Sequence, residues 1–312
     1  MLNRIRGKSS ILAKNLFYLI SKANITNLLI FLVALTITNP VLSFAEVRKE
    51  YYPSGELKAE KNYKKDKRNG ICKIYYESGK LNIEGNYKKG KREGITKIYY
   101  ESGMLNQEGN YKKDKRDGIT KIYYESGKLN QEGNYKKDKR EGITKIYYES
   151  GMLNQEGDFV NGKLEGTTKI YYENGKLKRE FNHKKGWVYG IAKWYYESGK
   201  LEREYNLKNS RLEGISTLYY ESGQVNQEGS YKKGKREGFG KVYYESGQLK
   251  KEGNFVNDKL EGICKAYYES GGIELIETFK NGQRINRKEY DENGKLVEEY
   301  YLPLKNIPPR KQ

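Results

Sequence analysis

The chain has 312 residues and a formal net charge of +19 at pH 7, from 60 lysines and arginines against 41 aspartates and glutamates. Only 36% of the residues are hydrophobic, 32% are charged and the mean hydropathy is −0.98, which excludes a deep apolar core. The 31 tyrosines argue against a disordered chain, because disordered sequences are poor in aromatic residues. Tyrosine suits a thin structure in which side chains are buried on one side and wet on the other.

The first 45 residues differ in composition from the rest of the chain. They hold five basic residues and no acidic one, then an apolar run over 28–37 and the small-residue sequence Ser43-Phe44-Ala45. This order is typical of a secretory signal peptide, here cleaved after Ala45, and the apolar run is too short to span a bilayer comfortably. We therefore expect export to the periplasm, the outer surface or the medium. An uncleaved anchor and a later start codon are the alternatives left open.

Export changes the partners expected of so basic a protein. Nucleic acid is the usual partner, but an exported chain is separated from cellular nucleic acid. A protein face or an acidic envelope or cell-surface ligand, including anionic lipid headgroups at the membrane periphery, is the better candidate.

Tyr-Tyr pairs recur every 24 residues along the remaining chain. They stand at 51/52, 75/76, 99/100, 123/124, 147/148, 171/172, 195/196, 219/220, 243/244 and 267/268, and an eleventh, degenerate unit begins at Tyr290-Asp291. A fixed short period of this kind indicates an open repeat array rather than globular domains.

One unit has the pattern of a β-hairpin. Residues 94–100 are rich in strand formers, 101–104 contain a turn glycine, 105–111 form the returning strand, and 112–118 connect to the next unit. Strand alternation divides the side chains between two faces. The core face takes Thr96, Ile98, Tyr100, Leu105, Gln107, Gly109 and Tyr111, and the wet face takes Lys97, Tyr99, Asn106, Glu108 and Asn110.

These patterns predict an all-β fold, an elongated single-layer antiparallel sheet of about eleven tandem 24-residue hairpins over 46–300. At about 4.8 Å per strand the sheet would be on the order of 100 Å long. Residues 301–312 form a basic, proline-containing tail. Exposed terminal strands leave dimerisation through the ends of the ribbon open.

The string Y-Y-E-S-G-x-L-N-x-E-G-N-Y-K-K-G-K-R-E-G, as at 75–94, resembles the MORN repeat. It is most similar to the variant called MORN-2, found in proteins labelled as YwqK-family antitoxins. The resemblance covers about residues 47–300. It implies an elongated, twisted antiparallel sheet that binds proteins or membrane surfaces and has no catalytic activity of its own.

Two sets of residues are candidates for a binding surface. The basic connectors all lie at the same end of their hairpins, so their charges should follow one long edge, which neutral connectors such as 160–164 and 256–260 interrupt. The alternative is that they only keep the ribbon soluble. The first tyrosine of each pair should form a row on the wet face, where the alternative is mutual packing of the rings. The candidates are Lys88, Lys91, Arg92, Lys112, Lys115, Arg116, Lys136, Lys139 and Arg140 for the edge and Tyr75, Tyr99, Tyr123, Tyr147 and Tyr171 for the row.

The segment 183–207 departs from the repeat pattern. Trp187 replaces a connector lysine, Trp194 takes a core-face position, and His183 and Leu207 take the position of Tyr111. Sequence drift and a specialised patch around Trp187 are both open. The single histidine, with no cysteine near it, does not predict a metal site.

Cys72 and Cys264 occupy equivalent core-face positions eight units apart. An open ribbon holds them far beyond disulfide reach, so both thiols are expected to be buried and unpaired.

No enzyme is expected. Glutamates such as Glu84 and Glu93 recur in every unit, whereas a catalytic pair needs one unique environment, and no cofactor motif is present. The sequence favours an exported scaffold with a multivalent protein- or envelope-binding surface, used in adhesion or host and cell-surface contact. The alternative, from the resemblance, is an antitoxin or immunity-like protein that masks a toxin.

Overall fold

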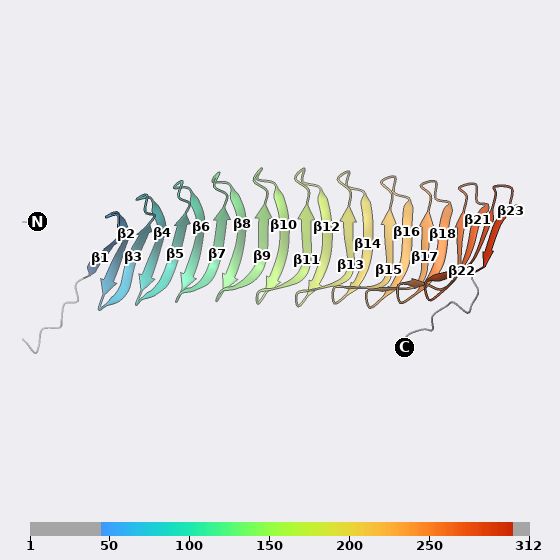
Figure 1. The fold of residues 1–312 in the computed structure, drawn as a ribbon. Coiled ribbons are helices and arrows are strands. Elements are labelled where there is room, and N and C mark those ends of the chain that lie inside the picture. The colour runs from blue at the N-terminus through green and yellow to red at the C-terminus, as the bar shows by residue number, and fades with distance from the viewer. Residues whose placement is uncertain (1–44, 302–312) are drawn as a thin grey trace, which may run out of the picture.

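The computed structural model describes residues 45–301, which form one open antiparallel sheet of 23 strands (Figure 1). Each strand pairs with its neighbour in the chain, so the hairpins stand in a row from the N-terminus to the C-terminus. The predicted all-β, single-layer repeat fold is therefore confirmed. The predicted signal peptide and basic tail lie outside the described residues, apart from Ala45 and Tyr301.

The strands follow one another without crossovers. They are β1 (Glu46–Tyr51), β2 (Leu57–Lys64), β3 (Lys67–Tyr75), β4 (Leu81–Lys88), β5 (Lys91–Tyr99), β6 (Leu105–Lys112), β7 (Lys115–Tyr123), β8 (Leu129–Lys136), β9 (Lys139–Tyr147), β10 (Leu153–Val160), β11 (Lys163–Tyr171), β12 (Leu177–Lys184), β13 (Trp187–Tyr195), β14 (Leu201–Lys208), β15 (Arg211–Tyr219), β16 (Val225–Lys232), β17 (Lys235–Tyr243), β18 (Leu249–Val256), β19 (Lys259–Leu260), β20 (Gly262–Tyr267), β21 (Ile273–Lys280), β22 (Gln283–Tyr290) and β23 (Leu296–Tyr301). The end strands β1 and β23 are exposed throughout, and the predicted pairing of ends stays a prediction.

Two kinds of turn alternate along the sheet. On one edge, Gly103 has φ +96° and donates its N–H to the carbonyl of Tyr100 at 2.9 Å. On the other edge, Lys89 and Gly90 have φ +54° and +85° and close a two-residue hairpin turn. The predicted seven-residue connectors are therefore wrong, because only two residues leave the strands there and the flanking lysines belong to the ladder.

The most buried side chains form one row along the core face, with one small residue from every second strand. The row follows the 24-residue period, with glycine at 240, and its side chains are those of Cys72, Thr96, Thr120, Thr144, Thr168, Ala192, Ser216 and Cys264, each at most 5% exposed. Thr96 lies between Gly85 and Gly109 on the neighbouring strands. A Cβ at Gly109 would lie only 2.9 Å from the Thr120 hydroxyl, so glycine is needed beside this small-residue row.

Aromatic rings cover the small-residue row on its core face. Tyr111 and Tyr135 are 8% and 5% exposed, as the predicted core face requires. The guanidinium of Arg92 lies 4.0 Å from the centre of the Tyr111 ring, and that of Arg116 lies 4.1 Å from the Tyr135 ring. A second layer of protein is thus replaced by a thin cover of rings and stacked cations.

At the edge that carries the Gly103-type turns, a hydrogen bond joins each unit to the next. The hydroxyl of the second tyrosine in a pair donates to the backbone carbonyl of the first tyrosine in the following pair, as from Tyr100 to Tyr123 at 2.8 Å. This tyrosine–carbonyl bond occurs ten times, at 2.7–2.8 Å. The series ends at Asp291, whose carboxylate instead accepts N–H groups of its own turn from Asn293 and Lys295.

Cys72 in β3 and Cys264 in β20 are free, buried thiols, as predicted. They lie near opposite ends of the sheet (Figure 1). Burial raises the pKa of the Cys264 thiol.

Replacing Tyr124 by Phe should weaken the junction between two units. The change removes only the hydroxyl that donates to the Tyr147 carbonyl at 2.7 Å, a loss of about 1 kcal/mol. Amide hydrogen exchange should become faster locally in β7 to β10, because repeat arrays open between units. Tyr51→Phe is the matched control, since the Tyr51 hydroxyl has no such bond among the described residues. Unchanged protection in Tyr124→Phe would contradict this role.

Candidate binding surfaces

The basic turns lie along one edge of the sheet, and turns with Val160 opposite Lys163 and Val256 opposite Lys259 interrupt the series. Cross-strand register places Lys88 opposite Lys91, Lys112 opposite Lys115 and Lys136 opposite Lys139, and all six side chains are exposed. Like charges directly opposite one another destabilise a sheet. We call these six residues the lysine edge. Their three like-charged pairs slightly reduce the stability of the folded sheet.

Hydrogen bonds fix each turn of the lysine edge against the next. The N–H of Gly90 donates to the carbonyl of Arg68 in the preceding unit at 2.8 Å. The N–H of Lys113 donates to the carboxylate of Glu93 at 3.1 Å, and the same bond recurs from Lys233 to Glu213 at 2.8 Å. Glu93 and its equivalents recur in too many units to form a catalytic pair, and these hydrogen bonds show that they fix the position of each turn against the next.

Arg92, Arg116 and Arg140 do not extend the lysine edge, which corrects the sequence-based prediction. Their guanidinium groups lie 4.0, 4.1 and 5.2 Å from the centres of aromatic rings on the core face. In addition, the backbone N–H groups of Arg92 and Arg116 donate to the carboxylates of Asp114 and Asp138 at 2.7 and 2.8 Å, and the Nε atoms of the two arginines lie 3.7 and 3.4 Å from the same carboxylates. These arginines are structural, because their charge is used within the sheet.

The row of first tyrosines lies on the predicted face but is half-buried. The hydroxyls of Tyr123, Tyr147 and Tyr171 donate to glutamates of the same face, Glu108, Glu132 and Glu156, at 3.0, 3.0 and 2.8 Å. Tyr75 makes the equivalent bond to Glu60 at 3.2 Å, and Tyr99 is likewise half-buried. Burial first, and then the bond to a carboxylate, raises the pKa of Tyr123, Tyr147 and Tyr171 to about 12.

Exposed isoleucines form a second row on this face, and the sequence reasoning missed them. Ile71, Ile95, Ile119, Ile143, Ile191, Ile215 and Ile263 are 52–60% exposed. Each stands immediately before a member of the small-residue row, so alternation puts it on the opposite face. Lys97 and Tyr99 are assigned to the wet face, and the same alternation places Ile95, two residues before Lys97, on that face. Continuing the alternation to Ile95 would therefore have found the isoleucine row.

Trp187 is exposed, and the structure adds two apolar neighbours to it. Trp187, Tyr189 and Ile191 alternate along β13 and are 58%, 55% and 53% exposed. Tyr189 stands where the other units carry a turn-binding glutamate such as Glu93. Beside Trp187 lies a hollow of about 440 Å³ whose lining includes Lys208, Arg211 and Lys233. The candidate patch is thus an apolar strand bordered by cations.

The other unusual aromatic residues of this segment belong to the core face. Trp194 packs between Phe181 and Tyr205, with ring centres 6.1 and 5.1 Å apart. His183 lies edge-on to Phe181 at 5.6 Å, and burial lowers the pKa of its imidazole. Its Nδ1 lies 3.1 Å from the Thr168 hydroxyl, which is a structural contact.

Other kinds of site were searched for within residues 45–301. That part of the chain holds no group of three or more His, Cys, Asp or Glu that could bind a metal ion. It also contains no helix long and apolar enough to cross a membrane.

The family model of the MORN repeat variant matches eleven segments of the chain. They are 47–65, 68–89, 92–113, 116–137, 140–161, 164–185, 189–209, 212–233, 236–257, 260–281 and 285–302. The chain belongs to the MORN repeat variant family. The segment 68–89 covers the paired strands β3 and β4 and ends in a turn of the lysine-bearing edge, so one family repeat is one strand pair. No curated protein matches the chain.

The tyrosine row of these MORN repeats should titrate at unusually high pH. The folded pKa of Tyr147 is about 12 against a usual 10.0, so the stability that this group contributes is complete below pH 10 and is lost as the pH rises towards 12. Tyrosine labelled with ¹³C at Cζ would report this titration by NMR. Glu132→Gln should lower the Tyr147 pKa, whereas Glu149→Gln in an exposed turn should leave it unchanged; equal effects would refute the assignment.

Proposed function

We propose that this MORN-repeat protein is an exported scaffold that binds a protein or an acidic component of an envelope or cell surface. Adhesion or host and cell-surface contact is the setting that we infer. The observation that carries the proposal is the isoleucine row, in which seven isoleucines at least half exposed recur along one face. Soluble monomers rarely expose a large apolar patch in a regular array unless a partner covers it.

Charge beside the isoleucine row indicates what kind of partner suits it. The lysine edge follows the same hairpins, and the chain carries a net charge of +19. Apolar contacts bordered by unpaired cations suit an acidic surface with apolar groups within it. The strand that bears Trp187, Tyr189 and Ile191 is the strongest single anchor, since aromatic residues dominate binding energy at interfaces.

Repetition supports a multivalent mode of binding. Most units offer an isoleucine on this face, and several of them add a pair of opposed lysines, so weak contacts add through a high effective concentration. A rigid sheet holds these groups in place before binding, which reduces the entropy lost on association. An extended or repetitive ligand gains most from such an array.

Export is tested by fractionating the producing cells and sequencing the N-terminus of the protein in each fraction. We expect a mature chain that begins at Glu46, outside the cytoplasm, because residues 1–45 have the order of a cleaved signal peptide. A cytoplasmic protein with its N-terminal segment intact would overturn export. That outcome would favour the antitoxin or immunity-like alternative, whose mark is a single tightly bound toxin of fixed stoichiometry.

The binding surface is tested with two defined polymers, poly-L-glutamate and a random copolymer of glutamate and leucine. Ile95→Thr, Ile119→Thr and Ile143→Thr together should weaken copolymer binding by about tenfold, because each removes apolar contact area. Binding of poly-L-glutamate should hardly change. Thr167 already occupies this position in one unit, so the substitution fits the fold, and Thr167→Ile should strengthen copolymer binding.

The lysine edge makes a separate contribution to the same measurement. Lys91→Gln, Lys115→Gln and Lys139→Gln together should weaken binding of both polymers and reduce its salt dependence. Because each change relieves a like-charged pair, the fold should become slightly more stable. Lys80→Gln, Lys128→Gln and Lys200→Gln together, in turns of the opposite edge, are the charge-matched control. Equal losses from both edges would mean that only net charge matters.

A further inference from the structure

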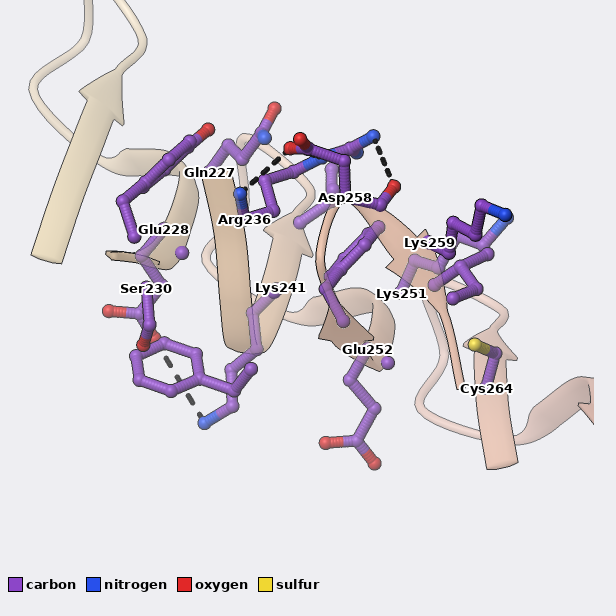
Figure 2. A pocket seen from close by; sticks show the side chains of 18 of the residues that line it. Gln227, Glu228, Ser230, Arg236, Lys241, Lys251, Glu252, Asp258, Lys259 and Cys264 are labelled. Atoms are coloured by element: carbon purple, nitrogen blue, oxygen red, sulfur yellow. Dashed lines mark hydrogen bonds and ion pairs between the residues drawn. The ribbon is translucent and has the colours of Figure 1, made fainter. Parts of the chain in front are cut away.

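A hollow interrupts the core face near the C-terminal end of the sheet (Figure 2). It has a volume of about 500 Å³ and lies over β16, β17 and β18. Gln227, Arg236 and Asp258 lie on one side of these strands, and Lys241 and Glu252 lie on the other (Figure 2). Its lining includes Tyr231 and Phe255 of the core face and also Phe239, which stands at the isoleucine-row position of its strand. The core-face side of the hollow is a second surface, and a role for it does not depend on the proposed function.

One sequence change explains the hollow. Position 240 belongs to the small-residue row, where the other units carry threonine, serine, alanine or cysteine, and here it is glycine. Cross-strand register pairs Gly240 with Gly229 on β16 and with Gly253 on β18. The space above Gly229 is open, because a Cβ there would meet nothing nearer than 3.5 Å, whereas the Phe255 ring lies over Gly240 and the Cys264 Sγ lies beside Gly253. We call this site the glycine hollow.

The walls of the glycine hollow are aromatic and more exposed than elsewhere. Tyr231 and Phe255 line it and are half-buried, whereas the equivalent Tyr111 and Tyr135 are 8% and 5% exposed. The Arg236 guanidinium lies 4.3 Å from the centre of the Phe255 ring. A site with a flat floor and aromatic walls suits a planar ring.

The chain itself shows what fits at this place on the core face. Two units earlier, the positions of Gly229 and Gly253 are occupied by Phe181 and Tyr205, whose rings lie on either side of Trp194. The same backbone positions thus accommodate a phenyl and a phenol ring when the sequence supplies them. In the glycine hollow the space at Gly229 is open, whereas at Gly253 the Cys264 Sγ would lie 2.5 Å from a Cβ.

A cation stands where it could meet the polar end of such a ring. Arg203 donates to the hydroxyl of Tyr205 at 3.4 Å. The equivalent residue in the glycine hollow is Lys251, which is exposed and forms no ion pair among the described residues. Lys259, on the rim, is also without an ion pair within residues 45–301. These charges favour a ligand that carries carboxylates beside its ring.

We propose that the glycine hollow binds a tyrosine side chain of an acidic polypeptide. The incoming ring would occupy the place that Phe181 fills in its own unit, above Gly229 and between Tyr231 and Phe255. Its hydroxyl would accept a hydrogen bond from Lys251, and flanking carboxylates would face Lys251 and Lys259. Specificity comes from the ring and its hydroxyl, while the acidic neighbours add affinity without sequence preference.

The test uses the full mature chain and labelled pentapeptides, Glu-Glu-Tyr-Glu-Glu against Glu-Glu-Ala-Glu-Glu, in fluorescence polarisation titrations. We expect the tyrosine peptide to bind at least tenfold more tightly. Gly229→Phe places a ring in the hollow from within, as Phe181 does, and should reduce binding to the level of the alanine peptide. Equal binding of the two peptides, or full binding to Gly229→Phe, would overturn the proposal.

Matched variants separate this site from a folding defect and from the isoleucine face. A Cβ at Gly229 meets its nearest atom at 3.5 Å, so Gly229→Ala is tolerated and should bind within twofold of the parent. Lys251→Gln should reduce the advantage of tyrosine over phenylalanine in the same peptide. Trp187→Lys, which restores the residue type of other units, should have no effect here. Loss of binding in Gly229→Ala or in Trp187→Lys would refute the site.

Discussion

The tyrosine–carbonyl bond is the interaction on which the array depends. A single-layer sheet has no second layer to bury its hairpins, so each unit must be held by its neighbours. Ten phenol hydroxyls make the same bond at 2.7–2.8 Å, and each spans one repeat period. Asp291 satisfies its own turn instead, and the series ends there.

The opposite edge is fixed by different chemistry to the same effect. Backbone N–H groups of each two-residue turn donate to the previous unit, and Glu93 and its equivalents accept from the turn that follows. With both edges fixed, positions on the exposed face are free to vary at little cost to folding. The isoleucine row and the Trp187 strand lie among those positions, which is why we assign binding to them.

On the core face, the aromatic ring of a unit stands at one of two positions. In most units a glycine lies two residues before a tyrosine or phenylalanine, whereas around Trp194 the rings stand at the glycine positions and His183 or Leu207 replaces that aromatic residue. The face therefore accepts an aromatic ring at either position. At Gly240 the small-residue row itself loses its side chain, and an open hollow results where the other units are filled.

The period of 24 residues, the strand alternation and the turn glycines were sufficient to predict the sheet and the burial of Thr96, Tyr111 and both cysteines. The repeat family was predicted from the resemblance of the repeat string. These features are local and recur from unit to unit. What the sequence alone could not decide depends on contacts between units. Only the tertiary structure placed Arg92 on the Tyr111 ring, tied the Tyr147 hydroxyl to Glu132 and opened a hollow at Gly240. Such contacts depend on the register between neighbouring strands, because a side chain's partner lies across the sheet and not along its own strand.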